Sequence, residues 1–329
     1  SLSRFVREAR VQGQLEHPAI VPVHDLAETP EGAAFFTMKR VRGASLDAIL
    51  DALASGDPEA RARHGRRKLL TAFATVCLAV DFAHARGVLH RDLKPANVML
   101  GDFGEVQVVD WGFAKVLQKG EVKRPDPARK GGSFSVITTT RSDPRRGSQS
   151  VAGSMMGTPA YMPPEQALGD VESLDERSDV FGLGAILCEI LTGEPPYGPD
   201  FRSALTMAAA ADLGPARGRL AACGADAALV ALCEQCLAPA PSARPADAGV
   251  LARALQQYLA AVRLLEVQAQ ATLVAIDGTE EPRGAVGPLP HGARIVAGAG
   301  VLDLDHIGAE VRQMQACDRP RKEASEIED

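Results

Sequence analysis

The sequence predicts an α+β fold in which a mostly helical body carries the remnant of a sheet-containing lobe. The few strand-like runs lie in the first third of the chain, whereas the later part consists of apolar runs at helical spacing that are separated by Gly and Pro. Hydrophobic residues make up 46% and charged residues 24%, values that are typical of a globular protein with a buried core.

The N-terminal part begins with an amphipathic helix, which we expect over residues 1–16 and which ends before Pro18. Two strand-like runs follow at residues 20–26 and 33–41. The turn sequence Thr29-Pro30-Glu31-Gly32 separates them, so a hairpin is expected here.

The later elements are mostly helical. Helices are expected at residues 45–55, 67–86, 178–192, 203–211, 225–237 and 246–265, and short strands at residues 97–100 and 106–109. A stretch rich in Lys, Arg, Ser, Thr, Gly and Pro covers roughly residues 118–155. It can be a solvated disordered loop, a region of autophosphorylation, or both.

Composition and charge exclude several classes of function. The formal net charge of −6 and the 4% aromatic content predict no nucleic-acid surface. Six Cys in 329 residues are too few for a disulfide scaffold, and Cys233 and Cys236 are better interpreted as helical core residues than as zinc ligands. No signal peptide or membrane segment is recognised, so we expect a cytoplasmic location.

The strongest motif is the run His90-Arg91-Asp92-Leu93-Lys94-Pro95-Ala96-Asn97. Phosphoryl transfer requires an acceptor hydroxyl, metal ions and phosphates to be held in line. Asp92 can accept the proton of the hydroxyl, Lys94 can offset negative charge, and Asn97 can ligate Mg²⁺. A charged turn between a helix and a strand would explain one or two of these residues, but not all of them in this order. The run resembles the catalytic loop of protein kinases.

A second metal ligand should follow this loop, and two Asp residues compete for the role. Asp102-Phe103-Gly104 spells the familiar kinase motif, but it lies between two strand-like runs, where Asp and Gly are turn residues. Asp110-Trp111-Gly112 comes after the second of these runs. The kinase pattern places the metal-binding Asp at that point, so the resemblance assigns Mg²⁺ to Asn97 and Asp110, and Asp102 is interpreted as a turn residue.

Later sequences agree with the same resemblance. Residues 157–165, Gly-Thr-Pro-Ala-Tyr-Met-Pro-Pro-Glu, resemble the end of a kinase activation segment. The resemblance implies that Glu165 pairs with Arg244 and that Asp179 anchors the backbone of the catalytic loop. Removing one partner of such a buried pair costs several kcal/mol, because the other charge is left unpaired.

Two further residues bear on substrate and regulation. Lys94 and Thr158 resemble the pair that bridges the catalytic Asp and the substrate-binding loop in kinases specific for Ser and Thr. Arg91, directly before Asp92, implies that a phosphorylated activation segment could be clamped by Arg.

The N-terminal part resembles the nucleotide-binding lobe only in part. Glu8 resembles the helical Glu that pairs with the ATP-binding Lys. The strand at residues 33–41 resembles the one that lines the adenine pocket, with Met38 at the gatekeeper position and the hinge from Lys39 to Val41.

Taken together, the chain resembles a bacterial-type Ser/Thr protein kinase over residues 1–262. The resemblance implies a partial N-lobe at residues 1–43 and a C-lobe at residues 44–262, whose activation segment spans residues 110–165. Residues 263–329 form an extension of unknown role. ATP and Mg²⁺ or Mn²⁺ are the implied cofactors, and the implied partners are Ser/Thr-containing proteins and a second copy of the chain for trans-autophosphorylation.

Two kinase features are missing from the sequence. Only seven residues precede Glu8, and they contain neither a Gly-rich loop nor a strand with the ATP-binding Lys. We therefore expect an N-terminally truncated kinase that is weakly active or inactive as it stands. A non-catalytic, kinase-like scaffold and a small-molecule phosphotransferase are the alternatives.

Overall fold

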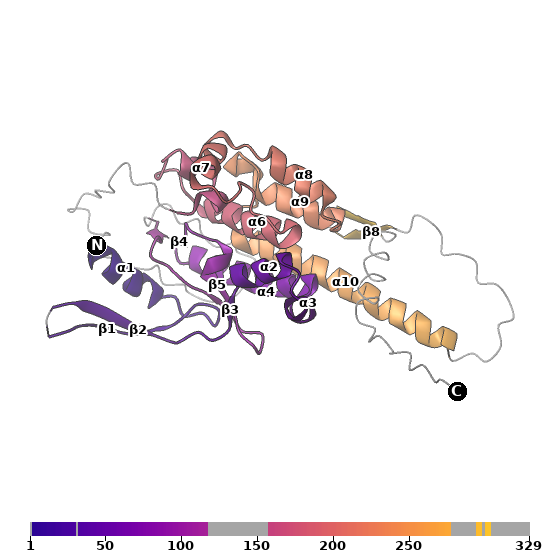
Figure 1. The fold of residues 1–329 in the computed structure, drawn as a ribbon, viewed down its shortest axis with the longest axis horizontal. Helices are drawn as coiled ribbons and strands as arrows, with labels where there is room; N and C mark the ends of the chain where they lie inside the picture. The colour runs from indigo at the N-terminus through magenta and orange to yellow at the C-terminus, as the bar shows by residue number, and fades with distance from the viewer. Residues whose placement is uncertain (1, 31, 118–156, 278–293, 298–299, 304–329) are drawn as a thin grey trace, which may run out of the picture. The chain divides into compact units, whose positions relative to one another are not determined.

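A computed structural model of the chain describes residues 2–30, 32–117, 157–277, 294–297 and 300–303 (Figure 1). The chain divides into two compact units: residues 1–225 with 230–256, and residues 226–229 with 257–329. The boundaries expected from the sequence after residues 43 and 262 stay predictions. The motif residues singled out above all belong to the first unit, which is described first.

The first unit is α+β and predominantly helical, as predicted. Its helices are α1 (Leu2–Gln12), α2 (Leu46–Ala54), α3 (Pro58–Arg63), α4 (Arg66–His84), α5 (Pro164–Ala167), α6 (Glu176–Thr192), α7 (Phe201–Ala210) and α8 (Gly214–Ala222). Its strands are β1 (Val23–Glu28), β2 (Ala34–Met38), β3 (Ala44–Ser45), β4 (Val88–Leu89), β5 (Val98–Leu100), β6 (Val106–Val108) and β7 (Lys115–Val116). Helices α9 (Ala227–Cys236) and α10 (Ala248–Asp277) each contribute residues to both units.

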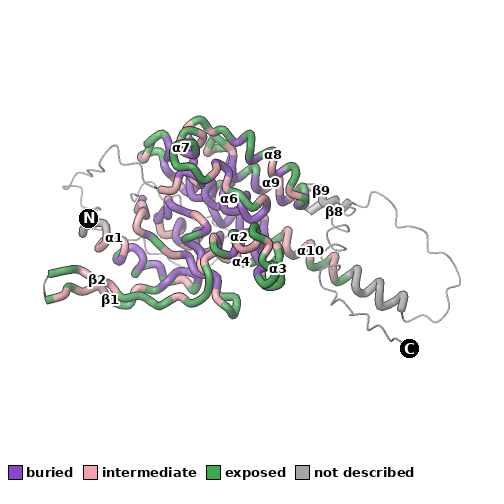
Figure 2. The backbone as a smooth tube through the Cα atoms, viewed as in Figure 1, coloured by how far each residue is buried: buried purple, intermediate pink, exposed green. Residues whose placement is uncertain are grey.

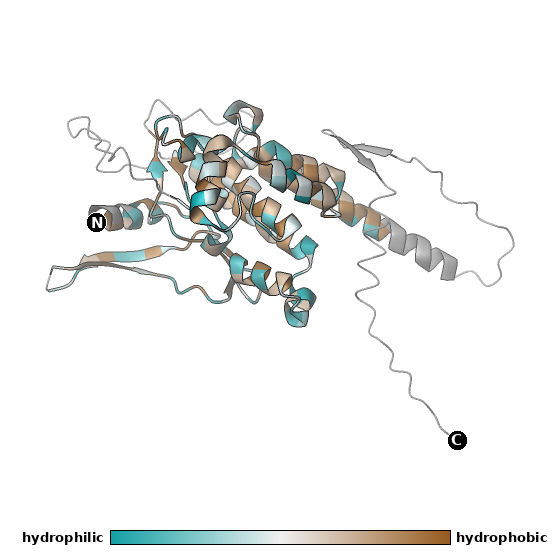
Figure 3. Cartoon of the chain, turned by 45° about the horizontal axis from the view of Figure 1, so that its top comes forward, coloured by the Kyte–Doolittle hydropathy of each residue, from teal (hydrophilic) through white to brown (hydrophobic). Residues whose placement is uncertain are grey.

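The predicted N-terminal helix and hairpin both form, with shifted ends. Helix α1 ends at Gln12 rather than at residue 16, since Gly13 follows and helical hydrogen bonding stops soon after it. The first strand begins at Val23 rather than at residue 20, because Pro22 has no N–H to donate to a ladder. Strands β1 and β2 then pair antiparallel, and Figure 3 shows that they mix hydrophobic and hydrophilic residues.

Three short helices, α3, α5 and α8, were missed. Helix α3 starts at Asp57, whose carboxylate accepts the Glu59 N–H at 2.8 Å, and Pro58 occupies its first turn. Helix α8 likewise has Pro215 in its first turn. Helices α3 and α5 are too short for hydrophobic periodicity to reveal, and α8 has Leu220 as its one large apolar residue. The Asp-Pro pair of α3 is nevertheless a recognisable signal for a helix start.

The core of this unit is built around α4 and α6. Figure 2 shows α6 buried along most of its length, and Val180, Leu183 and Leu187 are fully buried. Gly184 allows close packing, because a Cβ at this position would lie 2.5 Å from Cβ of Cys236. The prediction that Cys233 and Cys236 are core cysteines is confirmed, since both are buried. Within the described residues, no cluster of three or more His, Cys, Asp or Glu could hold a metal ion.

Short antiparallel pairs frame the predicted catalytic loop. Strand β4 pairs with β7, and β5 pairs with both β3 and β6. The β5–β6 hairpin confirms the turn predicted at Asp102. The segment after α1 runs beside β6, where Ala19 O accepts the Val108 N–H at 2.8 Å. This arrangement brings the loop after β4 and the residues after β6 together.

The second unit contains the later residues of α10 and a hairpin of β8 (Arg294–Ala297) and β9 (Gly300–Asp303). Helix α10 extends twelve residues beyond the predicted end at residue 265. Among the residues that the structure describes, no helix is both long and apolar enough to span a bilayer.

Candidate active site

The backbone of the predicted catalytic loop is held by Asp179 of α6. Its Oδ2 accepts the His90 N–H at 2.8 Å, and its Oδ1 accepts the Arg91 N–H at 2.8 Å. Arg91 has a φ of 70°, a left-handed conformation that costs a non-Gly residue about 1–3 kcal/mol. Two hydrogen bonds to a buried carboxylate can offset that cost, so the loop conformation depends on Asp179.

His84 at the end of α4 completes this anchor. Its Nε2 lies 2.9 Å from Oδ2 of Asp179, and both side chains are buried. Burial alone would lower the pKa of His84, but the hydrogen bond to Asp179 raises it above its ordinary value. Burial alone would raise the pKa of Asp179, but the bond from His84 and the Arg91 N–H hold it below its ordinary value. Both pKa shifts favour the charged form of the pair, an imidazolium beside a carboxylate.

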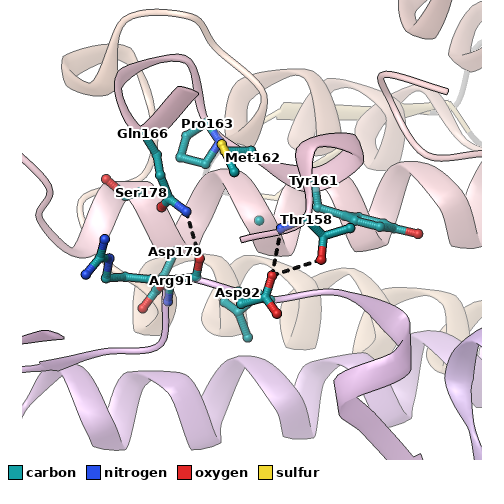
Figure 4. A pocket seen from close by; sticks show the side chains of 11 residues that line it. Arg91, Asp92, Thr158, Tyr161, Met162, Pro163, Gln166, Ser178 and Asp179 are labelled. Atoms are coloured by element: carbon teal, nitrogen blue, oxygen red, sulfur yellow. Dashed lines mark hydrogen bonds between the residues drawn. The ribbon is translucent and has the colours of Figure 1, made fainter. Parts of the chain in front are cut away.

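Asp92 lies at the centre of the site and is contacted by three predicted site residues. Its Oδ2 lies 2.9 Å from Nζ of Lys94 and 3.4 Å from Nδ2 of Asn97. Its Oδ1 accepts the Thr158 N–H at 2.9 Å and the Thr158 hydroxyl at 3.0 Å, contacts that Figure 4 shows from close by. Lys94 also donates to Oγ1 of Thr158 at 2.8 Å. The structure thus brings together residues from two distant segments.

Asp110 follows β6 and is tied to the catalytic loop through its neighbour. The Val109 N–H donates to Asn97 O at 3.0 Å, and Nε2 of His90 lies 3.2 Å from Val109 O. Asp110 itself is exposed and left-handed, with a φ of 60°. The ring of Trp111 is buried against His90, with ring centroids 4.6 Å apart. Asp110 is therefore presented beside Asn97 rather than packed into the core.

Asn97 and Asp110 suit a hard cation such as Mg²⁺. Nδ2 of Asn97 donates to Asp92 O at 2.8 Å, so the amide oxygen is the atom that can serve as a ligand. Asp110 offers an exposed carboxylate at the neighbouring position. Mg²⁺ is commonly held by one or two protein oxygens together with substrate phosphates. Asp102, in contrast, lies in the β5–β6 turn, 3.6 Å from the Arg63 guanidinium.

Glu8 reaches the same region from α1. A Cβ at Gly112 would lie 2.8 Å from Oε2 of Glu8 and 3.1 Å from Oδ1 of Asp110. Gly112 therefore leaves room for two carboxylates to approach its backbone. The pairing of Glu8 with an ATP-binding Lys stays a prediction.

The predicted gatekeeper and hinge lie at the end of β2. Met38 is the last residue of that strand and is 45% exposed. The Lys39 N–H donates to Pro22 O at 3.2 Å, and Val41 is half-buried. Gly43 then passes so close to β5 that a Cβ would collide with Leu100 O. The residues that follow the hinge thus lie directly beside β5, the strand after the catalytic loop.

Glu165 and Arg244 form a bidentate ion pair. The two guanidinium nitrogens lie 2.7 and 2.9 Å from the carboxylate oxygens, and the Arg244 side chain is completely buried. Arg244 also donates to the carbonyls of Ala238 and Pro239, and Ser178 donates to Glu165. The pair anchors the end of the activation segment to the helical core.

Several site residues were missed. Tyr161 donates to Oε2 of Glu189 at 2.7 Å, and burial raises the pKa of Glu189 to about 7. Gln166 donates to Arg91 O at 2.9 Å. A lone Glu in the apolar run of α6 could have indicated a buried partner, whereas no local signal marks Gln166.

The predicted phosphate clamp is only partly visible. Burial lowers the pKa of Arg91, whose side chain lines the pocket beside Asp92 and Thr158. The segment expected to carry the phosphate, roughly residues 118–155, lies outside the described residues. The clamp therefore stays a prediction.

Comparisons with known proteins agree with the geometry. Residues 1–258 match the protein kinase domain family. The chain is 38% identical over 197 residues to the serine/threonine-protein kinase PknD of Chlamydia trachomatis, covering 59% of this chain and 20% of that protein. It is 36% identical over 198 residues to PknD of Protochlamydia amoebophila (59% and 19%) and 37% identical over 200 residues to PknB of Mycobacterium tuberculosis (60% and 26%).

The chain thus spans about a fifth to a quarter of the length of these relatives. The family match covers all residues of the candidate site around Asp92. The relatives that it matches are bacterial serine/threonine-protein kinases, and the chain itself belongs to the protein kinase family.

Proposed function

We propose that this chain carries the catalytic and substrate-binding part of an ATP- and Mg²⁺-dependent protein kinase that phosphorylates Ser and Thr. The observation that supports this most strongly is the contact set of Asp92, which joins Lys94, Asn97 and Thr158 around one carboxylate. A structural ion pair would require only one of these partners.

Each residue has a defined role in this proposal. Asp92 orients the acceptor hydroxyl and takes up its proton, and Lys94 offsets the negative charge that develops on the transferred group. Thr158 holds Asp92 in register with the segment on which the protein substrate would lie. Asn97 and Asp110 would hold Mg²⁺, which neutralises phosphate charge when bound. Met38, Lys39 and Val41 would contact the adenine ring of ATP.

The proposal includes autophosphorylation, in trans within a homodimer. Residues 118–156 contain several Ser and Thr between the two ends of the activation segment. A phosphate there would supply the acceptor oxygens that Arg91 can bind.

The test uses a form of the chain that carries an added ATP-binding segment. A segment with a Gly-rich loop and a strand Lys, taken from one of the bacterial relatives, is joined upstream of residue 1, and binding of a fluorescent ATP analogue is measured first. Transfer of labelled γ-phosphate to the chain itself and to Ser/Thr peptides is then compared with that of Asp92→Asn. We expect Asp92→Asn to lower the rate by about 100-fold or more, with thermal unfolding little changed.

A folded, nucleotide-binding protein that transfers no phosphate, with Asp92→Asn behaving identically, would overturn the proposal. That result would favour the non-catalytic scaffold instead. Activity toward small alcohols without peptide labelling would favour the small-molecule phosphotransferase.

A further inference from the structure

Gln166 of α5 occupies an unusual place for an amide side chain. It is 5% exposed and lines the pocket beside Asp92, as Figure 4 shows. Its Nε2 donates to Arg91 O at 2.9 Å. The Arg91 N–H is held by Asp179, so side chains from two different helices hold both polar groups of this left-handed residue.

The same amide packs against the end of the activation segment. A Cβ at Gly157 would lie 2.8 Å from Nε2 of Gln166 and 3.4 Å from Arg91 O. Gly157 also has a φ of 122°, which other residues rarely adopt. The next residue is Thr158, whose N–H and hydroxyl bind Asp92. Gln166 therefore lies where the catalytic loop and the activation segment meet.

From this geometry we propose that Gln166 is a positioning residue for phosphotransfer. Its amide donates to Arg91 O and packs against Gly157. These two contacts keep Thr158 in position to hydrogen-bond with Asp92. The effect on catalysis rests on the kinase function proposed above, whereas the effect on the local backbone does not.

The chemistry of the site distinguishes this role from simple packing. The amide side chain of Gln166 is buried, which is unfavourable for polar atoms unless they make hydrogen bonds. A residue chosen only to fill space would be apolar. Removing Nε2 would leave the partly buried carbonyl of Arg91 without this donor, and such an unmade bond costs more than a made bond gains.

Gln107 of β6 provides a matched control. It is 6% exposed, and its Nε2 donates to Pro18 O at 3.1 Å. Gln166→Met and Gln107→Met thus remove the same group from equally buried positions. Only the first of them touches the catalytic loop.

Amide hydrogen exchange tests the structural role in the full chain without nucleotide. We expect Gln166→Met to accelerate exchange in peptides that cover residues 157–162 by about tenfold, the equivalent of one hydrogen bond. Gln107→Met should leave these peptides unchanged, although both variants lower the unfolding temperature. Equal acceleration in the two variants, or none in Gln166→Met, would overturn the proposal.

The kinetic test uses the chain fitted with a nucleotide-binding segment. We expect Gln166→Met to lower kcat about tenfold without changing KM for ATP. Gln166→Glu adds a pH signature, since a protonated carboxyl can donate to Arg91 O and a carboxylate cannot. Its defect relative to the unaltered protein should grow from pH 5.5 to pH 8.5, whereas the defect of Gln166→Met should stay constant.

A pH-independent defect in Gln166→Glu would contradict the donor role. If the unaltered protein transfers no phosphate, the kinase proposal fails, and the exchange experiment still decides whether Gln166 positions Thr158. The two failures are thus distinguishable.

Discussion

The helical part of the first unit and the α1–β1–β2 region hold their functional groups in opposite ways. In the helical part, Asp92, Asp179 and Arg244 are at most 5% exposed, and each has several polar partners. In the α1–β1–β2 region, Met38 and Lys39 are exposed, as Figure 2 shows for the strand end and the hinge. Asp92, which is proposed to meet the protein substrate, is therefore fixed, whereas Met38 and Lys39, which are proposed to meet ATP, lie at the surface.

The difference follows from the cost of burying charge. A buried ion loses its hydration and is stable only with well-placed partners, so each buried carboxylate or guanidinium constrains the backbone around it. An exposed side chain has water as an alternative partner and constrains little. The helical part can thus hold its catalytic geometry without a nucleotide.

The largest expected effect is the difference in activity between variants of the two Asp residues that follow the catalytic loop. In a nucleotide-binding form of the chain, Asp110→Ala should reduce Mg²⁺-dependent phosphate transfer about 10³-fold, because a metal ligand is lost. Asp102→Ala should be nearly silent, since this residue forms an exposed ion pair with Arg63 at the surface. Initial rates measured over a range of Mg²⁺ concentrations check both. Similar losses in the two variants would show that the assignment of Asp110 is wrong.

The next effect concerns stability rather than activity. Arg244→Met should lower the free energy of unfolding by about 3–5 kcal/mol, because Glu165, whose side chain is 11% exposed, is left without its cation. Urea unfolding followed by circular dichroism measures the loss.

Arg63→Met is the control for this comparison, because Arg63 is 56% exposed in its ion pair with Glu59. It should cost less than about 1 kcal/mol. If Arg244→Met cost no more than Arg63→Met, the buried pair would not anchor the activation segment.

The smallest effect is a pH dependence at the catalytic-loop anchor. Since the folded pKa of His84 is raised above its ordinary value of 6.5, its stabilising contribution is complete below pH 6.5 and is lost as pH rises through the folded pKa. His84→Gln keeps a donor but no charge. It should lower the free energy of unfolding by about 2 kcal/mol at pH 5.5 and by clearly less at pH 9.5.

His24, which is exposed, is the matched control for this experiment. Replacing it with Gln should give the same small change at both pH values. A cost of His84→Gln that did not vary with pH would contradict a charged His84.

Local patterns predicted most of the elements. The apolar runs of α4, α6 and α7 and the hairpin of β1 and β2 were recognisable because periodicity and turn residues act over a few positions. The ends were less accurate, as at Gly13 and Pro22, and the short helices α3, α5 and α8 were missed. Helix ends and single turns depend on individual capping bonds, such as that of Asp57, which periodicity does not report.

Site residues that lie close together in the sequence were predicted, whereas those that depend on distant partners were not. Asp92, Lys94 and Asn97 lie within one loop, so their spacing alone indicated their chemistry. Asp110 was preferred over Asp102 because a hairpin needs a turn, and the β5–β6 register confirms that turn. Glu189 and Gln166 were not predicted as site residues, since their hydrogen-bond partners lie far away in the sequence.

The sequence by itself determined the family, the candidate catalytic residues and the order of most elements, because these depend on residue types at short, regular spacing. Only the tertiary structure decided which distant side chains hold the candidate catalytic residues in place. Arg244 and Glu165 are 79 positions apart, and Asp179 and Arg91 are 88 apart. Nothing in a short window specifies such pairs, because they are selected by the need to satisfy charges buried when the helices pack together.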